Sequence, residues 1–276
     1  MWRIEDSPTN SDLLSVQSWS NGDAIAVGKD GTCIARRSGS WEIFDLDFDE
    51  DLYGVWGLGL DHFFAVGGNL RVGGQSKVCE FSAGEWSVRD SGIQSLVLSI
   101  CGNEAGIIRA VGFNGGIVEK SGSGFIEIGA ETNDHLFVVQ SIGISGWIVG
   151  GLNGTLKEWD GNSWTHLDVT HSHINGIGVL KHNATILVTH AGDVIERTGG
   201  TWQFAQLQYR TTLHDVAVGP ERDRGYACGA NGTVLKRESA GDWCREPCPT
   251  DKTLFSIGVA ENSATVVGAS GTILRV

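Results

Sequence analysis

Short apolar segments recur along the whole chain with nearly the same internal pattern. Each repeat begins with one apolar residue and a second one three positions later, as in Leu13 and Val16. An Ala-Val-Gly segment such as 26–28 follows, then a tight turn such as 30–31 and another short apolar segment. Asp-Gly and Asn-Gly turns supply the positive φ angles of two-residue hairpins, so this pattern predicts β-hairpins rather than helices.

The repeat has a regular length, which can be measured between its first apolar residues. These anchors are Leu13, Leu52, Val97, Leu136, Ile174, Leu213 and Leu254. Their partners three positions on are Val16, Val55, Ile100, Val139, Ile177, Val216 and Ile257. The intervals between anchors are 39, 45, 39, 38, 39 and 41 residues, and a period of about 40 residues with four strand-like segments is typical of a β-propeller blade. Residues three apart in a regular strand point to opposite faces, so we expect each pair to contact both neighbouring blades.

An aromatic residue opens the fourth segment of six repeats, at Trp41, Trp86, Phe125, Trp164, Trp202 and Trp243. The last repeat ends at Val276 without one. At the other end of the chain, Trp2 precedes Leu13 by 11 residues, the interval that separates aromatic and anchor in all but one of the other repeats. We therefore predict that residues 1–5 form the outer strand of the last blade and close the ring.

The predicted fold class is all-β, a seven-bladed β-propeller of four-stranded blades closed by the N-terminal strand. We expect a single domain over residues 1–276, with blades near 13–51, 52–96, 97–135, 136–173, 174–212, 213–253 and 254–276 plus 1–12.

Charge and composition narrow the class of function. The 33 Asp and Glu residues against 20 Lys and Arg give a formal net charge of −13, and a negative surface repels phosphate backbones, so we expect no nucleic-acid partner.

No segment approaches the roughly 20 apolar residues of a membrane helix, and residues 1–12 contain no apolar signal core. We therefore expect a cytoplasmic protein, or a virion protein if the gene is viral. Arginine outnumbers lysine, as in acidic proteins of salt-loving organisms; an ordinary acidic protein is the alternative.

Six cysteines are present. Four of them occupy apolar strand positions, which predicts small buried thiols: Cys33, Cys79, Cys101 and Cys228. Cys244 and Cys248 could form half of a metal site or a strained disulfide. No second cysteine pair at zinc spacing follows them, so we expect neither a metal nor a cofactor.

The repeat resembles those of the seven-bladed propellers grouped with YVTN, bacterial-neuraminidase and photosystem II stability-factor repeats. The resemblance covers the whole chain and is carried by L-x-x-V, A-V-G-x-[ND]-G-x-[IV] and G-x-W. It implies the fold, whereas proteins of this kind include assembly factors, adhesins, lectins and enzymes. Sialidases among them carry an S-x-D-x-G-x-T-W box, of which only fragments occur here, at 160–164 and 198–202. We expect no catalytic residues.

The loops after the second and fourth strands of a propeller blade share one face, here called the upper face; the other turns share the lower face. The turn after the second strand of blade two is lengthened to residues 68–76, and its Asn69, Leu70 and Arg71 would offer contacts to a ligand. A tolerated insertion is the alternative. Histidines gather on the same face near blade five, at His171, His173, His190 and His214, with His135 one blade away.

A His-x-His pair in one strand points both rings the same way, which favours a polar ligand patch at His171 and His173. A bound metal and a polar rim without a ligand are the alternatives, and no Asp or Cys at firm spacing completes a metal site. We predict a ligand-binding surface of Asn69, Leu70, Arg71, His171, His173, His190 and His214.

The function we predict is a non-enzymatic binding or scaffold propeller, part of a larger assembly, with protein partners. The first alternative is a glycan- or receptor-binding adhesin, such as a virion or tail component of a halophilic host's virus. The second is a glycosidase or lyase. Because the lower turns are short and rich in glycine and serine, we expect the interaction surface on the upper face.

Overall fold

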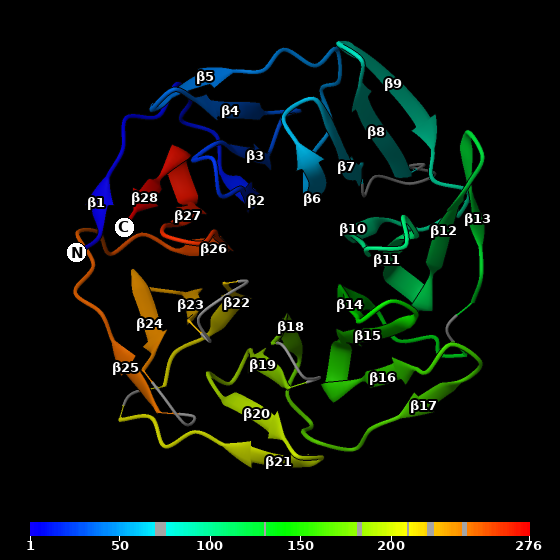
Figure 1. Ribbon diagram of the computed structural model, residues 1–276, viewed down its shortest axis with the longest axis vertical. Helices are drawn as coiled ribbons and strands as arrows, with labels where there is room; N and C mark the ends of the chain where they lie inside the picture. Colours follow the sequence, from blue (N-terminus) through cyan, green and yellow to red (C-terminus); the bar gives the residue numbers. More distant parts are fainter. Residues whose placement is uncertain (70–75, 130, 181–183, 209, 220–223, 239–241) are drawn as a thin grey trace.

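The computed structural model describes residues 1–69, 76–129, 131–180, 184–208, 210–219, 224–238 and 242–276 (Figure 1). These residues form seven four-stranded antiparallel sheets arranged as blades around a central channel. In each blade the strands run in order from the channel to the outer edge. The predicted all-β, seven-bladed propeller is therefore confirmed.

Blade 1 contains β2 (Leu13–Ser18), β3 (Ala24–Gly28), β4 (Cys33–Arg37) and β5 (Ser40–Ile43). Blade 2 contains β6 (Leu52–Gly59), β7 (His62–Gly68), β8 (Ser76–Ser82) and β9 (Glu85–Asp90). Blade 3 contains β10 (Val97–Gly102), β11 (Ile108–Gly112), β12 (Ile117–Ser121) and β13 (Gly124–Glu127). Blade 4 contains β14 (Leu136–Ile142), β15 (Gly146–Gly151), β16 (Leu156–Trp159) and β17 (Trp164–His166). Blade 5 contains β18 (Ile174–Val179), β19 (Thr185–Thr189), β20 (Val194–Thr198) and β21 (Thr201–Phe204). Blade 6 contains β22 (Leu213–Val218), β23 (Gly225–Gly229), β24 (Thr233–Arg237) and β25 (Trp243–Arg245). Blade 7 contains β26 (Leu254–Val259), β27 (Ala264–Gly268), β28 (Ile273–Arg275) and β1 (Arg3–Ile4).

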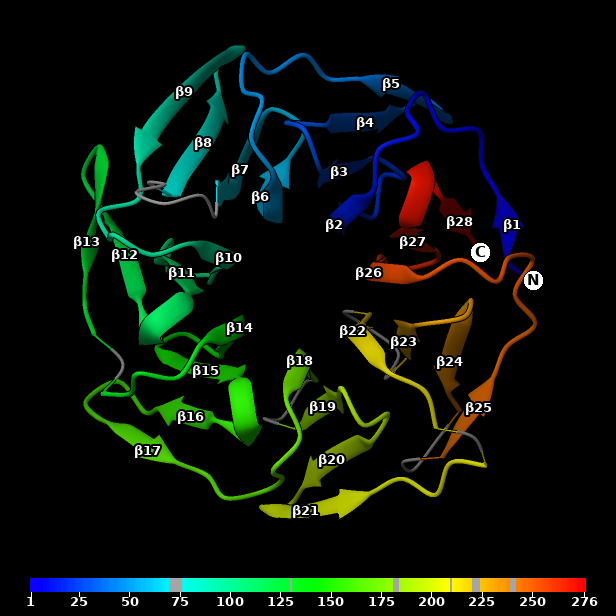
Figure 2. The same cartoon turned by 180° about the vertical axis from the view of Figure 1, so that it is seen from behind.

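Blade 7 is built from both ends of the chain. The short strand β1 pairs antiparallel with β28, with Arg3 opposite Arg275 and Ile4 opposite Leu274. In Figure 2 the two termini lie together at this blade. Trp2 is 3% exposed and packs edge-on against Tyr226 of blade 6, with the ring centroids 5.5 Å apart. The predicted closure by the N-terminal segment is confirmed.

A β-bulge lies at the start of the first strand of each blade. In β2, Leu13 pairs with Gly28 and Ser15 with Val27, so Leu14 has no partner in the ladder. The other six first strands show the same shift. The extra residue turns Leu13 and Val16 to the same face, and both pack between blades 7 and 1. The prediction that each anchor pair points to opposite faces is therefore wrong, because the bulge breaks the regular alternation of the strand.

The hydrophobic core lies between adjacent blades. Ile25 and Val27 of β3 pack with Leu52 of blade 2, whereas Ala24 and Ala26 of the same strand face blade 7. Each blade is thus apolar on both faces, and each fully buried aliphatic side chain contributes about 1.5–3 kcal/mol to folding. The buried positions include the thiols of Cys33, Cys79, Cys101 and Cys228, as predicted. Burial raises the pKa of Cys79 to about 12 and the pKa of Cys101 to about 11.

The glycine that ends the Ala-Val-Gly segment has a packing role. A Cβ atom on Gly28 would lie 2.0 Å from the carbonyl oxygen of Asp12, because the link that enters the blade crosses the strand there. Gly67, Gly112 and Gly151 meet the same obstacle in blades 2, 3 and 4. The helices in the described residues are single 3-10 turns on the upper face, η1 (Phe113–Gly115), η2 (Leu152–Gly154) and η4 (Ala269–Gly271). No described helix is long and apolar enough to cross a membrane.

Candidate functional site

The central channel forms a cavity with a volume of about 890 Å³. Its wall is made by the first strands of the blades. The bulged second residue of each first strand lines its upper part, and all seven are half-buried: Leu14, Tyr53, Leu98, Phe137, Asn175, His214 and Phe255. Five apolar or aromatic side chains and two polar ones, on adjacent blades, therefore form a ring at the upper mouth.

Aromatic and imidazole rings continue from this ring across blades 4 to 7. Phe137 lies edge-on to His173 at 6.4 Å between centroids, and His173 lies 5.7 Å from His190. His214 lies 5.7 Å from Phe255 in the next blade. Burial lowers the pKa of His214, and the neighbouring His190 lowers it further. We call these five residues the upper-mouth wall.

Three of the predicted histidines, His173, His190 and His214, therefore lie close together, but His173 also has a structural role. Its Nδ1 accepts a hydrogen bond of 3.0 Å from the backbone N–H of Asn153, which has a positive φ in the preceding blade's turn. His135 holds Asn114 in the same way, at 3.1 Å. In two other blades a carboxylate takes this position, since Asp12 and Asp51 accept the N–H groups of Ser270 and Asp30. A residue just before the anchor thus fastens the neighbouring turn.

Two other predicted site residues that the structure describes, His171 and Asn69, are not part of the wall. His171 and His173 precede β18 in a bend rather than lying in a strand, so the His-x-His geometry expected from the sequence is wrong. His171 is exposed, and no described residue forms a hydrogen bond or ring contact with it. Asn69 is exposed and follows β7. The predictions for Leu70 and Arg71 fall outside the described residues.

A carboxylate in the channel wall joins blades 6 and 7. Asp215, the third residue of β22, accepts hydrogen bonds from the hydroxyl of Ser256 at 2.8 Å and the N–H of Ile257 at 3.0 Å. The N–H of Val216 donates to its other oxygen at 2.8 Å. Burial nevertheless raises the pKa of Asp215 to about 6. Its donors come from the protein backbone and a neighbouring serine, so Asp215 acts as an inter-blade link rather than as part of a facing carboxylate pair.

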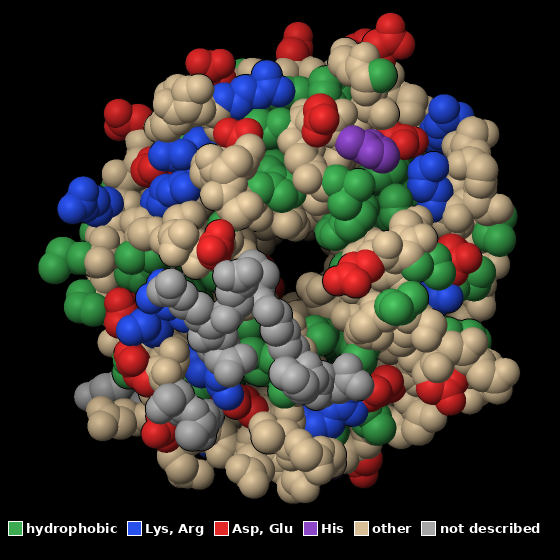
Figure 3. All heavy atoms as spheres, in the orientation of Figure 1, with side chains coloured by type: hydrophobic (Ala, Val, Ile, Leu, Met, Phe, Trp, Pro, Cys, Tyr) green, Lys and Arg blue, Asp and Glu red, His purple; other side chains and the backbone are tan. Residues whose placement is uncertain are grey.

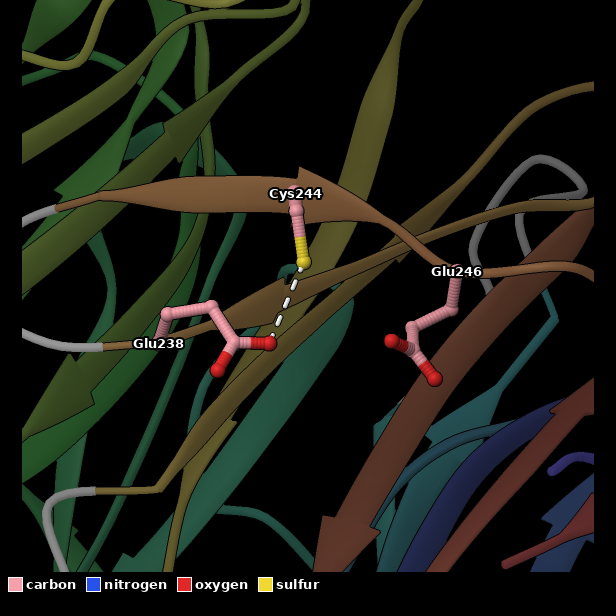
Figure 4. Close-up of side chains that lie close together, drawn as sticks. All are labelled: Glu238, Cys244 and Glu246. Carbon is pink, nitrogen blue, oxygen red and sulfur yellow. Dashed lines mark hydrogen bonds between the residues drawn. The ribbon is translucent and has the colours of Figure 1, made fainter.

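A second cluster lies on the outer strands of blade 6 (Figure 4). Cys244, Glu238 and Glu246 offer ligand atoms within 4.8 Å of one another, and the Cys244 thiol lies 3.4 Å from a Glu238 oxygen. The Lys236 ammonium already pairs with Glu238 at 2.8 Å. Burial, with the two carboxylates, raises the pKa of the Cys244 thiol, whereas a metal needs the thiolate. Cys248 is not part of this group, so the arrangement does not extend the Cys244 and Cys248 pair considered from the sequence.

Sequence reasoning missed exposed apolar side chains on the lower face. Leu58 at the end of β6 is 72% exposed and lines the channel, and Ile144 in the first turn of blade 4 is 68% exposed. The available signal was the segment Gly57-Leu58-Gly59, in which a leucine stands between two glycines at a strand end. The expectation that the lower turns offer few side chains is wrong for these blades.

A ring of seven four-stranded blades around a lined channel defines this chain as a seven-bladed β-propeller. It is similar to YCF48 bound to D1 peptide (TM-score 0.79, 15% identity, 99% of this chain and 96% of that chain). YCF48 from Cyanidioschyzon merolae gives a TM-score of 0.78 at 17% identity, over 99% and 98% of the two chains. Virginiamycin B lyase from Staphylococcus aureus gives 0.86 at 11% identity, over 100% and 98%.

These identities show the fold alone. The neighbours are nevertheless consistent with the repeat type that the sequence resembles. No family model and no curated protein matches the sequence.

Proposed function

We propose that this chain is a non-enzymatic binding propeller that serves as a subunit of a larger assembly and engages a protein partner at its upper mouth. The observation that carries the proposal is the upper-mouth wall, in which Phe137, His214 and Phe255 line the channel. His173 and His190 lie beside them, in ring contact with Phe137 and with each other. Half-buried aromatic side chains give large apolar contact area at low entropic cost, and imidazoles add donors and acceptors. A solved neighbour of the same fold is described as bound to a peptide.

The titratable groups support binding rather than catalysis. A tyrosine nucleophile of the sialidase kind needs a stabilised phenolate. Burial and the carboxylate of Asp51 instead raise the pKa of Tyr53 to about 12, and burial raises the pKa of Tyr226. The Arg–Glu pairs of the structure join strands and blades, as Arg109 with Glu119 and Arg197 with Glu158 do. These guanidinium groups therefore already have carboxylate partners.

Two alternatives use the same surface. A surface glycan would stack on the aromatic side chains of the ring, as expected for an adhesin or virion component. Two observations favour a lyase. A solved lyase has the same fold, and no described residue forms a hydrogen bond with the imidazole nitrogens of His190 and His214. The experiment below therefore includes both a glycan and a turnover measurement.

The test is the double variant His190→Gln with His214→Gln. These two side chains are not engaged in holding a turn, whereas His173 is, so their replacement should leave the melting temperature within about 2 °C of wild type. Tagged wild-type and variant protein would be compared by quantitative co-purification, and each co-purifying protein would then be titrated against both by interferometry. We expect at least tenfold weaker binding of one such protein to the variant.

His135→Gln is the matched control, because it removes an imidazole that holds a turn outside the wall. Equal binding by wild type and the double variant would contradict the proposal. Binding on a glycan array that the double variant loses would favour the adhesin, and turnover of an array glycan would favour the enzyme.

A further inference from the structure

The lower face presents a leucine that the backbone is shaped to expose. In β6, Gly57 pairs with Phe63 and Gly59 with His62, so Leu58 is the extra residue of a second bulge. A Cβ atom on Gly57 would lie 2.3 Å from that of Phe63, so glycine is needed for the strand to approach this closely. The result is a leucine that is 72% exposed beside the lower opening of the channel. Exposed leucine at such a bulge differs from a scattered surface residue, because the bulge and the closely packed Gly57 fix its position on this face.

Neighbouring turns extend this apolar feature and hold it rigid. The indole N–H of Trp19 in blade 1 donates to the carbonyl oxygen of Gly57 at 3.1 Å, which fixes the backbone beside Leu58. In blade 3 the side-chain amide of Asn103 donates to the carbonyl oxygen of Ile144 in blade 4 at 2.6 Å. Ile144 is 68% exposed. Hydrogen bonds thus join the first turns of blades 1 and 2, and those of blades 3 and 4. We define the lower platform as these four turns, residues 19–23, 58–62, 103–107 and 143–146.

The turns of blades 2 and 3 in this lower platform carry negative charge, because Asp61 and Glu104 are exposed there. The blade 1 turn contains Asp23, but Arg36 and Arg275 donate hydrogen bonds to the carbonyl oxygen of its Gly22, so the acidic part of the platform lies in blades 2 and 3. Glu104 is exposed and lines the channel. Figure 3 shows this face: hydrophobic side chains gather over β6 beside the opening, and acidic side chains lie at its edge next to β10. Apolar side chains set among carboxylates are complementary to a surface that carries apolar side chains together with lysine or arginine.

We infer that the lower platform is a second docking surface, which receives a basic amphipathic segment of a partner protein. The apolar face of the segment would cover Leu58, Ile144 and Trp19, and its cations would lie against Glu104 and Asp61. Such a propeller would hold two partners, one at each mouth of the channel. The inference does not depend on the upper-mouth proposal, because the residues that test the two lie on opposite faces.

The probe is a fluorescein-labelled peptide of about 14 residues, LKKLLKLLKKLLKL, whose leucines form one helical face and whose lysines form the other. Its binding to the full chain would be measured by fluorescence anisotropy, with LEELLELLEELLEL as the reversed-charge peptide. We expect the basic peptide to bind and the acidic peptide to bind at least tenfold more weakly. Leu58→Ser and Ile144→Ser should each weaken binding of the basic peptide about tenfold. Glu104→Gln should reduce the dependence of binding on salt.

Two control variants decide whether the platform is responsible. Ile43→Ser replaces a similarly exposed aliphatic side chain on the outer strand β5, where Ile43 is 59% exposed. Asp47→Asn with Asp49→Asn removes carboxylates from the acidic segment 45–51 on the upper face, where a basic peptide could bind by charge alone. Both controls should bind the peptide as wild type does. The inference is overturned if the Leu58 and Ile144 variants bind like wild type, or if either control weakens binding as much as they do.

Discussion

The indole of Trp41 donates a hydrogen bond of 2.7 Å to the carboxylate of Glu5, across the seam where the two ends of the chain meet. The same carboxylate accepts hydrogen bonds of 3.1 and 3.2 Å from the guanidinium of Arg36. Glu5 directly follows β1 in blade 7, whereas Trp41 and Arg36 belong to blade 1. The side chains of one blade therefore fasten the strand that closes the ring.

The same arrangement joins blades 5 and 6. Glu196 of β20 accepts hydrogen bonds from the guanidinium of Arg237 and from the indole of Trp243, which belong to β24 and β25. Trp41 and Trp243, which open the fourth strands of their blades, thus do more than pack between blades. Each donates its indole N–H to a carboxylate in the preceding blade.

Removing the carboxylate at the seam should destabilise the ring. Glu5→Ala leaves the mostly buried Arg36 without its counter-charge and the Trp41 N–H without an acceptor, which should lower the free energy of unfolding by about 2 kcal/mol. Glu42→Ala, an exposed position on β5, is the control and should change it by less than about 0.5 kcal/mol. Urea unfolding followed by tryptophan fluorescence measures both. Equal stability of the two variants would mean that the seam does not depend on this carboxylate.

Adjacent leucines in β2 should respond very differently to truncation, because the bulge separates their environments. Leu13 is fully buried between blades, whereas Leu14 lines the channel and is half-buried. We expect Leu13→Ala to cost about 2–5 kcal/mol of unfolding free energy and Leu14→Ala less than about 1 kcal/mol. The two variants remove the same atoms from neighbouring positions, so each is the other's control. Similar losses would indicate that Leu14 packs between blades as well.

The blade pattern and the closure of the ring could be predicted from the sequence because both depend on local signals. The hairpin turns, the anchors and the interval from Trp2 to Leu13 repeat at fixed spacing. The bulge could not be derived from alternation, although an anchor spacing of three in every blade was a signal for it. A regular strand with both anchors on one face would show a spacing of two or four.

The side-chain partners across blades lay beyond a local pattern. His173 binds the turn that carries Asn153, about half a repeat earlier in the chain, and only the assembled ring brings the two together. The exposure of Leu58 likewise depends on the pairing of Gly57 and Gly59 with β7. From the sequence pattern alone, Leu58 would be predicted to be one more apolar residue of a buried strand. Sequence reasoning therefore located the upper-face histidines but could not separate those that fasten turns from those that face the channel.

Thiol chemistry should separate two groups of cysteines. Cys33, Cys79, Cys101 and Cys228 are buried, whereas Cys244 and Cys248 are half-buried. Burial between blades keeps a reagent away from the first group, whereas it can reach the second group, although the pKa values of Cys244 and Cys248 are raised as well. Labelling of the native protein at pH 8 with a maleimide should modify Cys244 and Cys248 within minutes, and denatured protein should show all six thiols. Peptide mapping that finds rapid labelling at Cys33 or Cys228 would contradict the packing between blades.

The pH dependence of stability should reveal the Asp215 carboxyl. Its pKa in the folded protein is raised to about 6 from 3.8, so the folded state binds a proton more tightly than the unfolded state does. The stabilisation from this group is therefore fully present below about pH 4 and is lost as the pH rises through about 6. Asp215→Asn removes this titration and keeps an oxygen that can accept the Ser256 and Ile257 hydrogen bonds. Because wild type loses this stabilisation and the variant does not, the variant should gain stability relative to wild type. We expect the difference in unfolding free energy, variant minus wild type, to increase by roughly 2 kcal/mol between pH 4.5 and 7.5. Urea unfolding of both proteins at each pH measures this difference, and the other carboxyl groups cancel because both proteins share them. A constant difference across the range would show that Asp215 titrates near its usual value.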